Sequence, residues 1–273
     1  MQSVAAQRDD SSVLHLKTEE PPICFCRNIL VTLCFDGRGF HGFQIQKNAL
    51  TVQEVFQNAL YKIIGGPADI KGCSRTDAGV HANQYCISFK TSHLIPVIRL
   101  RSALNRFLPY TIAVLNCVEV PIDFHARYSC KRKEYVYKIW NTEIKNPFLH
   151  GLAYHYRYKI DENQLNESAK SFIGKHDFTS FCTEDHRQKN NMVREIFNFS
   201  VSRDENLIQM SVEADGFLYN MVRIMVGTLL RVSQNKIQSD NIINIIEAKN
   251  RKYAGPTAPA CGLYLNKVFY DTE

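Results

Sequence analysis

The sequence predicts an α+β fold with a mixed, mostly antiparallel sheet, flanking helices and two halves of similar size. Segments with the period of a strand are interleaved with segments of helical period, and short connections join them. No long run of strictly alternating β and α units occurs, which disfavours a purely parallel sheet. With 273 residues, the chain suits one large domain or two modest ones.

Residues 1–27 mix serine, acidic residues and prolines without periodicity, which predicts a mobile extension outside the fold. The first half of the fold, 28–122, starts with a strand whose two faces are both apolar. A capping box, Thr51 to Glu54, opens an amphipathic helix that stops near Gly65. The elements expected in this half are strands at 29–35, 85–89 and 112–120, a helix from 52 to near 65, and a helix at 97–107.

The second half, 123–273, repeats the mixture of strands and helices and carries the other two candidate motifs. Gly174 follows one helical pattern and predicts its end. The expected elements are strands at 135–140, 196–201, 207–212 and 262–270, and helices at 161–173, 217–232 and 240–250.

Composition narrows the class of protein without fixing its function. The 33 Lys and Arg residues exceed the 27 Asp and Glu residues, an excess compatible with a nucleic-acid partner but also common elsewhere. Nine scattered cysteines suit a reducing compartment, and their spacing does not indicate a metal site. No apolar stretch approaches the roughly twenty residues that span a bilayer, and no secretion signal is evident. We expect a cytoplasmic protein without a membrane anchor.

Two segments contain candidate catalytic residues. Asp77 lies between Arg75 and a small-residue turn, so its carboxylate can project from a tight loop, although an aspartate in a turn is more often only a turn residue. Arg223 is the first charge in an otherwise apolar helix. A buried guanidinium needs an anion beside it, such as a carboxylate or a phosphate; a structural ion pair or a side chain that reaches solvent is the alternative.

These segments together resemble the TruA-type transfer-RNA pseudouridine synthases, from about residue 28 to residue 270. The most specific motif is Arg-Thr-Asp-Ala-Gly-Val-His, and several other motifs follow in the family's order. Ser74, Phe43 and Ile45 depart from the Gly, Trp and polar residue that the family usually has there. The motifs that carry the resemblance lie at 36–44, 51–53, 74–82, 133–137, 176–181 and 217–227.

The resemblance implies a pseudouridine synthase fold with a central cleft, and an enzyme that isomerises uridine in the anticodon stem-loop of transfer RNA, at positions 38–40. It implies that Asp77 is the nucleophile, that Arg223 pairs with it and keeps it ionised, and that Tyr135 stacks on the target base and takes part in proton transfer. Such an isomerisation needs no cofactor and no metal ion. Family members form homodimers that share the transfer RNA.

Other residues are expected to bind or position the substrate. By resemblance, Arg75 fills the space left by the flipped uridine. His81 more plausibly orients the catalytic loop than acts as a base, and Leu263 either packs on the flipped base or fills the core. Lys131, Arg132 and Arg101 are candidates for binding the phosphate backbone, with a merely solvated surface as the alternative.

Two other classes of function stay open on the sequence alone. The chain could bind and fold RNA without catalysis, which the presence of all three candidate catalytic residues disfavours. It could also bind a small molecule, which the absence of any dinucleotide or phosphate-loop motif disfavours.

Overall fold

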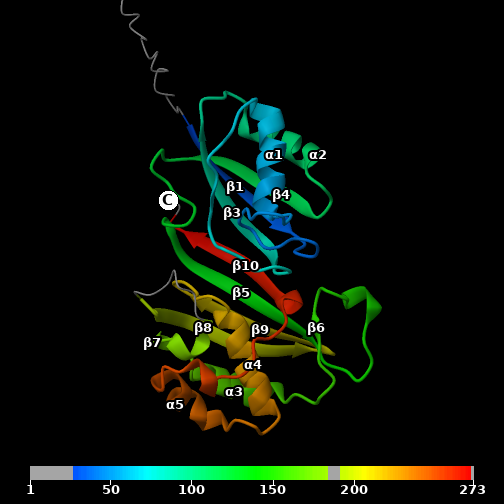
Figure 1. Ribbon diagram of the computed structural model, residues 1–273, viewed down its shortest axis with the longest axis vertical. Helices are drawn as coiled ribbons and strands as arrows, with labels where there is room; N and C mark the ends of the chain where they lie inside the picture. The colour runs from blue at the N-terminus through cyan, green and yellow to red at the C-terminus, as the bar shows by residue number, and fades with distance from the viewer. Residues whose placement is uncertain (1–26, 184–190, 272–273) are drawn as a thin grey trace, which may run out of the picture.

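A computed structural model describes residues 27–183 and 191–271 of the chain. The predicted extension, 1–27, therefore lies outside the described residues except for Arg27. The described chain forms one continuous ten-stranded sheet with helices packed against it, as Figure 1 shows. This confirms the predicted α+β class.

The strands run β4-β1-β3-β10-β5-β9-β8-β7 across the sheet, and β2 and β6 pair with β3 and β5 at its sides. The β10–β3 and β5–β6 pairs are parallel and the others antiparallel. The strands are β1 (Arg27–Phe35), β2 (Lys71–Gly72), β3 (His81–Thr91), β4 (Ile112–Val120), β5 (Cys130–Trp140), β6 (Tyr154–His155), β7 (Gly174–Asp177), β8 (Val193–Asp204), β9 (Leu207–Ala214) and β10 (Leu263–Tyr270).

The helices form two groups, one over each end of the sheet (Figure 1). Because β10 comes from the end of the chain and lies between β3 and β5, it joins the strands of the two halves into one sheet. The first group is α1 (Val52–Ile64) and α2 (Val97–Phe107), and the second is α3 (Glu162–Lys170), α4 (Met221–Ser233) and α5 (Ile242–Glu247). The described helices do not include one long and apolar enough to cross a membrane.

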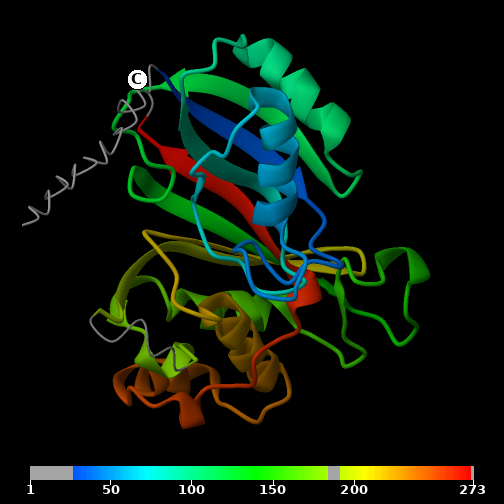
Figure 2. The same cartoon turned by 45° about the horizontal axis from the view of Figure 1, so that its top comes forward.

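Both helix groups pack on the same face of the sheet (Figure 2). Side chains along a strand alternate between the two faces of the sheet. Val212 and Met210 of β9 pair with Tyr135 and Tyr137 of β5, so these four buried side chains lie on the same face. The helices cover this face at its two ends. The site described below lies between the two helix groups.

Local sequence signals explain where the helices begin and end. Thr51 caps α1, since its hydroxyl accepts from the amide of Glu54 at 3.3 Å, and Gly65 ends the helix at φ 73°. The helix predicted from residue 217 begins only at Met221, because Asn220 is left-handed, with φ 61°. The helices predicted at 161–173 and 240–250 are shorter in the structure, with Gly174 at φ 109° opening β7 and Lys249 at φ 46° following α5.

Candidate active site

A cleft of about 1280 Å³ lies between the two helix groups. Its walls come from parts of the chain far apart in sequence: the loop before α1, the loop between β2 and β3, the strand β5, and the start of α4. The described lining residues include five cations, Arg75, Arg127, Lys133, Arg194 and Arg223, and two carboxylates, Asp77 and Asp215. The cleft is therefore suited to an anionic ligand.

Asp77 and Arg223 meet inside this cleft. The Arg223 guanidinium donates from one terminal nitrogen to Oδ2 of Asp77 at 3.0 Å. Their side chains keep 17% (Arg223) and 25% (Asp77) of their surface exposed, so the pair is mostly removed from water but open to a ligand. The predicted contact between the two residues is present, and a mostly buried ion pair holds each charge in place.

Arg223 is held by two further acceptors, which fix the direction of its guanidinium. Its Nε donates to the Ala258 carbonyl at 2.7 Å, and the nitrogen that binds Asp77 also donates to Oδ1 of Asn220 at 2.8 Å. The Ala258 amide in turn donates to the Arg223 carbonyl at 3.0 Å. Arg223 therefore reaches Asp77 in one defined orientation.

Two glycines allow the loop before α1 to pack directly against the loop that carries Asp77. A Cβ on Gly42 would lie 2.2 Å from the Thr76 carbonyl oxygen, and one on Gly37 would lie 2.1 Å from that of Val80. The amide of Phe43 donates to the Thr76 carbonyl at 3.3 Å across this contact. The glycine-rich motif at 36–44 thus packs directly against the loop that carries Asp77 and supports its backbone.

Tyr135 lines the cleft beside Asp77. Its hydroxyl lies 3.2 Å from Oγ of Ser74, and its ring meets Phe217 edge-on at 4.9 Å between centroids. Burial raises the pKa of Tyr135, so the residue is a neutral phenol at neutral pH. Ser74, which departs from the family pattern, therefore supplies a hydroxyl partner to this tyrosine.

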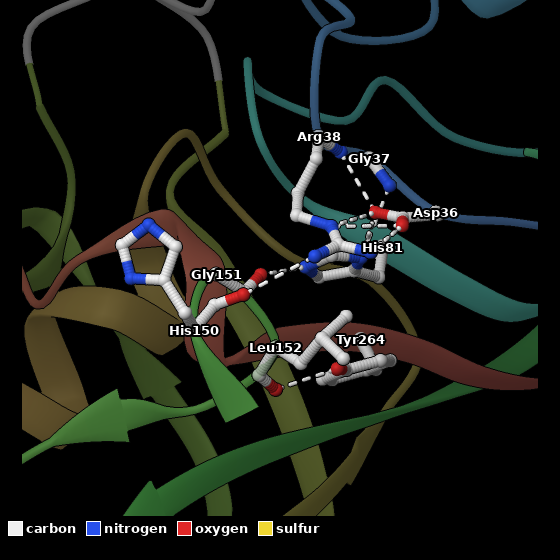
Figure 3. A network of polar contacts seen from close by, with 8 residues as sticks. All are labelled: Asp36, Gly37, Arg38, His81, His150, Gly151, Leu152 and Tyr264. Carbon is white, nitrogen blue, oxygen red and sulfur yellow. Dashed lines mark hydrogen bonds and ion pairs between the residues drawn. The ribbon is translucent and has the colours of Figure 1, made fainter. Parts of the chain in front are cut away.

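His81 lies outside the cleft, on the opposite face of the sheet, in the network of Figure 3. Only 1% of it is exposed. Its Nδ1 accepts from the Gly37 amide at 3.0 Å, so Nε2 carries the proton and donates to the Gly151 carbonyl at 3.0 Å. The ring also stacks on Tyr264 at 4.6 Å. Both ring nitrogens are engaged by the protein, and the loop-orienting role of His81 stays a prediction.

The remaining predicted residues divide into two sets. Arg75 and Leu263 line the cleft. Lys131, Arg132 and Arg101 do not line it. Lys131 pairs with Asp271 at 3.0 Å, and Arg101 is on α2. Because side chains alternate along a strand, Arg132 points to the opposite face of the sheet from its neighbour Lys133. Arg132 there contacts Glu213 at 2.5 Å. Whether these three bind RNA stays a prediction.

The cleft residues that the sequence analysis did not single out include Arg194, Tyr128 and Asn220. Arg194 is the second residue of β8 and is partly buried, and in the sequence a charge near a strand end looks like ordinary surface. Asn220 is the left-handed residue before α4, and a break in the helical pattern at Gly216 is the local signal that could have indicated it. The described residues contain no group of three or more His, Cys, Asp or Glu side chains able to hold a metal ion.

Comparisons with known proteins agree with these motifs. The family model described as tRNA pseudouridine synthase matches residues 33–129 and 168–271. The tRNA pseudouridine synthase A of Thermoanaerobacter sp. (strain X514) is 42% identical over 244 residues, which is 89% of this chain and 100% of the relative. That of Acetivibrio thermocellus is 43% identical, with the same coverage.

A solved structure of a Cbf5-Nop10-Gar1 complex is similar over 88% of this chain and 59% of the matched chain, at 10% identity and a TM-score of 0.38. The family model covers well over half of this chain, and relatives above 40% identity span nine-tenths of it. The chain therefore belongs to the tRNA pseudouridine synthase family, a family of isomerases.

Proposed function

We propose that this protein isomerises uridine to pseudouridine in the anticodon stem-loop of transfer RNA, with Asp77 as the nucleophile. The observation that carries the proposal is the ion pair between Asp77 and Arg223 inside a cationic cleft. The substrate class follows the relatives, which are named tRNA pseudouridine synthase A. The anticodon stem-loop, at positions 38–40, follows the motif resemblance.

Asp77 has the surroundings that a carboxylate nucleophile needs. The guanidinium 3.0 Å away attracts its negative charge, and a quarter of the side chain remains open to the cleft. Because Arg223 is held by Ala258 and Asn220 as well, Asp77 meets a cation that is already oriented before substrate arrives. Covalent attack then divides a difficult bond exchange into two easier steps.

The reaction balances without any external group. Asp77 bonds to the nucleotide, the bond between the uracil nitrogen and the ribose breaks, and the uracil rotates. A ring carbon then bonds to the ribose and Asp77 is released. That carbon gives up its hydrogen and the freed nitrogen gains one, so there is no net oxidation or reduction. Tritium placed on that carbon is therefore released to water in proportion to turnover.

Three neighbours of Asp77 are assigned supporting roles. Tyr135 presents a neutral phenol whose ring can stack on the target base and whose hydroxyl, near Ser74, can relay a proton as an acid. Arg75 is exposed at the cleft and can occupy the gap that a flipped uridine leaves in the RNA stack. Leu263 is a buried apolar contact in the same cleft, against which a flipped base can pack.

The experiment that tests the proposal compares the wild-type chain with Asp77→Asn on an unmodified, tritiated transfer-RNA transcript. Asparagine keeps the shape of the side chain but cannot act as the nucleophile, so we expect no isomerisation and a transcript affinity within a few-fold of wild type. The melting temperature of each protein controls for folding. Tritium release by Asp77→Asn above about a hundredth of the wild-type rate would contradict the assignment.

A second transcript tests the position of the reaction. Cytidines replace the uridines of the anticodon stem-loop at 38–40, and all other uridines stay. We expect the wild-type chain to release no tritium from this transcript. Release at the unaltered rate would place the reaction elsewhere in the RNA. Binding of transcripts without any release would favour the RNA-folding alternative.

The family resemblance also leads us to propose a homodimer that works in the cytoplasm. Transfer RNA is the shared substrate in that arrangement, and the scattered cysteines suit a reducing compartment. Light scattering on the purified chain tests the dimer: a mass of one chain, 31.4 kDa, without transcript, and the mass of one chain plus one transcript in the complex, would contradict it.

A further inference from the structure

Tyr128 is a strongly exposed aromatic residue that lines the catalytic cleft. The structure leaves 77% of it exposed, although it is part of the wall that also contains Asp77. A single exposed aromatic residue is common on protein surfaces and needs no function by itself. The rigidity of the backbone beneath Tyr128 is what separates it from an ordinary surface residue.

The turn that carries Tyr128 is closed by its own side chains. The Ser129 amide donates to the His125 carbonyl at 2.9 Å, and the His125 amide donates to Oγ of Ser129 at 3.1 Å. Nδ1 of His125 accepts from the Arg127 amide at 3.0 Å, and the Tyr128 amide nitrogen lies 3.4 Å from the same Nδ1. These bonds satisfy backbone groups that would otherwise need water, so the turn has a defined shape.

The same turn is tied to the sheet beneath it. The Ala126 amide donates to the buried Oγ of Ser88 on β3 at 2.9 Å, and the Tyr270 hydroxyl of β10 donates to the Ala126 carbonyl at 2.7 Å. Ala126 itself is fully buried. Two strands of the central sheet therefore anchor the turn, and Arg127 and Tyr128 project from a fixed base.

The ring of Tyr128 is supported but not covered. The His125 ring lies 4.4 Å from it, tilted by 38°, and the Arg127 guanidinium lies 5.8 Å from its centre. Orienting the ring before a ligand arrives reduces the entropy lost on binding. The cations Lys133 and Arg194 line the same cleft, so a ligand at Tyr128 combines a flat apolar face with nearby negative charge.

We propose that Tyr128 is a stacking platform for an unpaired nucleobase that flanks the target uridine, while Arg127 binds the adjoining phosphate. An RNA nucleotide fits because it joins an aromatic face to an anion, the combination that this wall of the cleft complements. The inference rests on the proposed function, in which RNA enters the cleft. It adds a residue that affects the affinity for RNA and the position of the RNA in the cleft, and that takes no part in the exchange of bonds.

The test measures the affinity of full-length chains for one unmodified transfer-RNA transcript at several salt concentrations. Asp77→Asn is the common background, so that no turnover occurs during the measurement. The variants added to it are Tyr128→Leu, Tyr128→Phe, Tyr128→Trp and Arg127→Gln. The matched control is Tyr253→Leu, because Tyr253 is also exposed, at 61%, and does not line the cleft.

We expect Tyr128→Leu to weaken binding about 5- to 50-fold at every salt concentration, since a leucine cannot stack on a base. Tyr128→Phe, Tyr128→Trp and the control should stay within about two-fold of the parent chain. The salt slope should be unchanged in Tyr128→Leu, because stacking releases no counterions. Arg127→Gln should lower that slope by a little under one.

Two results would overturn the proposal while leaving the proposed function intact. Tyr128→Leu could bind within about two-fold of the parent, or Tyr128→Phe could lose as much affinity as Tyr128→Leu, which would indicate a hydroxyl contact instead of stacking. Tyr128→Trp adds an independent readout: its fluorescence above the background of Trp140 should be quenched by the transcript, and no quenching counts against stacking. Failure of the wild-type chain to release tritium would instead contradict the proposed function itself.

Discussion

The side chains of Asp77 and Arg223 meet although 146 positions separate them in the chain. The pair is mostly buried, so neither charge is well solvated if the other is removed. Arg223 contributes to the fold as well as to the site, because the guanidinium that faces Asp77 also donates to the Ala258 carbonyl. A substitution there should affect stability and activity together.

Arg223→Leu is expected to cost about 1–3 kcal/mol of unfolding free energy, less than the roughly 3–5 kcal/mol of a fully buried pair because both side chains keep some solvent contact. Tritium release should fall below detection in the same variant. Arg223→Lys should be less destabilised but still impaired, since an ammonium cannot reproduce the forked contacts to Asp77 and Ala258. Denaturant unfolding and the isomerisation assay measure the two effects; wild-type activity in Arg223→Leu would disprove the pairing as a catalytic feature.

His81 connects three segments of the chain at one buried point (Figure 3). Burial lowers its pKa, and the nearby Arg38 and Lys138 add to this, while Asp36 at 3.3 Å and the bond to Gly151 oppose it. The carboxyl of Asp36 carries a charge under the same conditions: burial opposes ionisation there, but hydrogen bonds from Arg38 outweigh it and lower the pKa of Asp36. The neutral ring is therefore the form that fits this network.

The folded state should lose stability as the pH falls below the ordinary histidine value of 6.5. The folded pKa is lower than the unfolded one, so the unfolded chain binds more protons in that window, and the stability that His81 contributes is present above pH 6.5 and declines below it. His81→Gln, which cannot titrate, should show a weaker decline. Melting temperatures of both proteins between about pH 5 and pH 8 measure the difference. Parallel curves would show that His81 does not titrate in this range.

Among the helices, α4 has a close backbone contact with the segment at 255–258. A Cβ on Gly227 would lie 1.7 Å from the Pro256 carbonyl oxygen, and one on Gly255 would lie 2.5 Å from that of Gly227. The segment packed there continues to Ala258, which binds Arg223 on the same helix. The spacing between α4 and this segment thus sets the position of the cation.

Gly227→Ala is expected to destabilise the protein by about 1–3 kcal/mol, because the backbone must separate to admit the methyl group. The shift should also draw the Ala258 carbonyl away from Arg223 and lower the rate of isomerisation. Gly66→Ala is the matched control, since a Cβ there meets nothing within 4 Å. Thermal melting and tritium release measure both effects, and equal behaviour of the two variants would contradict the close contact.

Over the whole molecule, the distribution of cations predicts which surface holds RNA. Phosphate contacts supply most of the affinity of such a complex and make it depend on salt. The cleft contains Arg127, Lys133 and Arg194, whereas Lys131, Arg132 and Arg101 lie outside it. The two sets have equal formal charge and different positions, and in the outer set Lys131 and Arg132 are also paired with Asp271 and Glu213.

Replacing the cleft set by alanine should reduce the slope of log affinity against log salt by about two to three, because each phosphate contact formed on binding releases somewhat less than one counterion and the variant lacks these contacts. It should raise KM far more than it lowers kcat, since these cations hold substrate and transition state alike. The outer set receives the same triple replacement. A reduced slope there would show that the RNA extends past the cleft, and an unchanged slope would show that those residues are only solvated surface.

Local sequence signals were sufficient for the long strands, for most of the helices and for the identity of the motifs, but not for the short strands β2, β6 and β7 or for the start of α4. The alternation in β1, the Thr51 cap and the spacing along α1 all act within a few residues, where short-range sterics and hydrogen bonds decide the conformation. The motif around Asp77 likewise identified the candidate nucleophile and the family without any tertiary information.

Only the tertiary structure decided which of these residues share a site. The insertion of β10 between β3 and β5 brings the two halves together, and the contact of Gly227 with Pro256 sets the distance from which Arg223 reaches Asp77. A shift of one residue along a strand places Lys133 in the cleft and Arg132 on the opposite face. Such outcomes depend on strand pairing and packing between distant segments throughout the core. A pattern of neighbouring residues in the sequence does not contain this information.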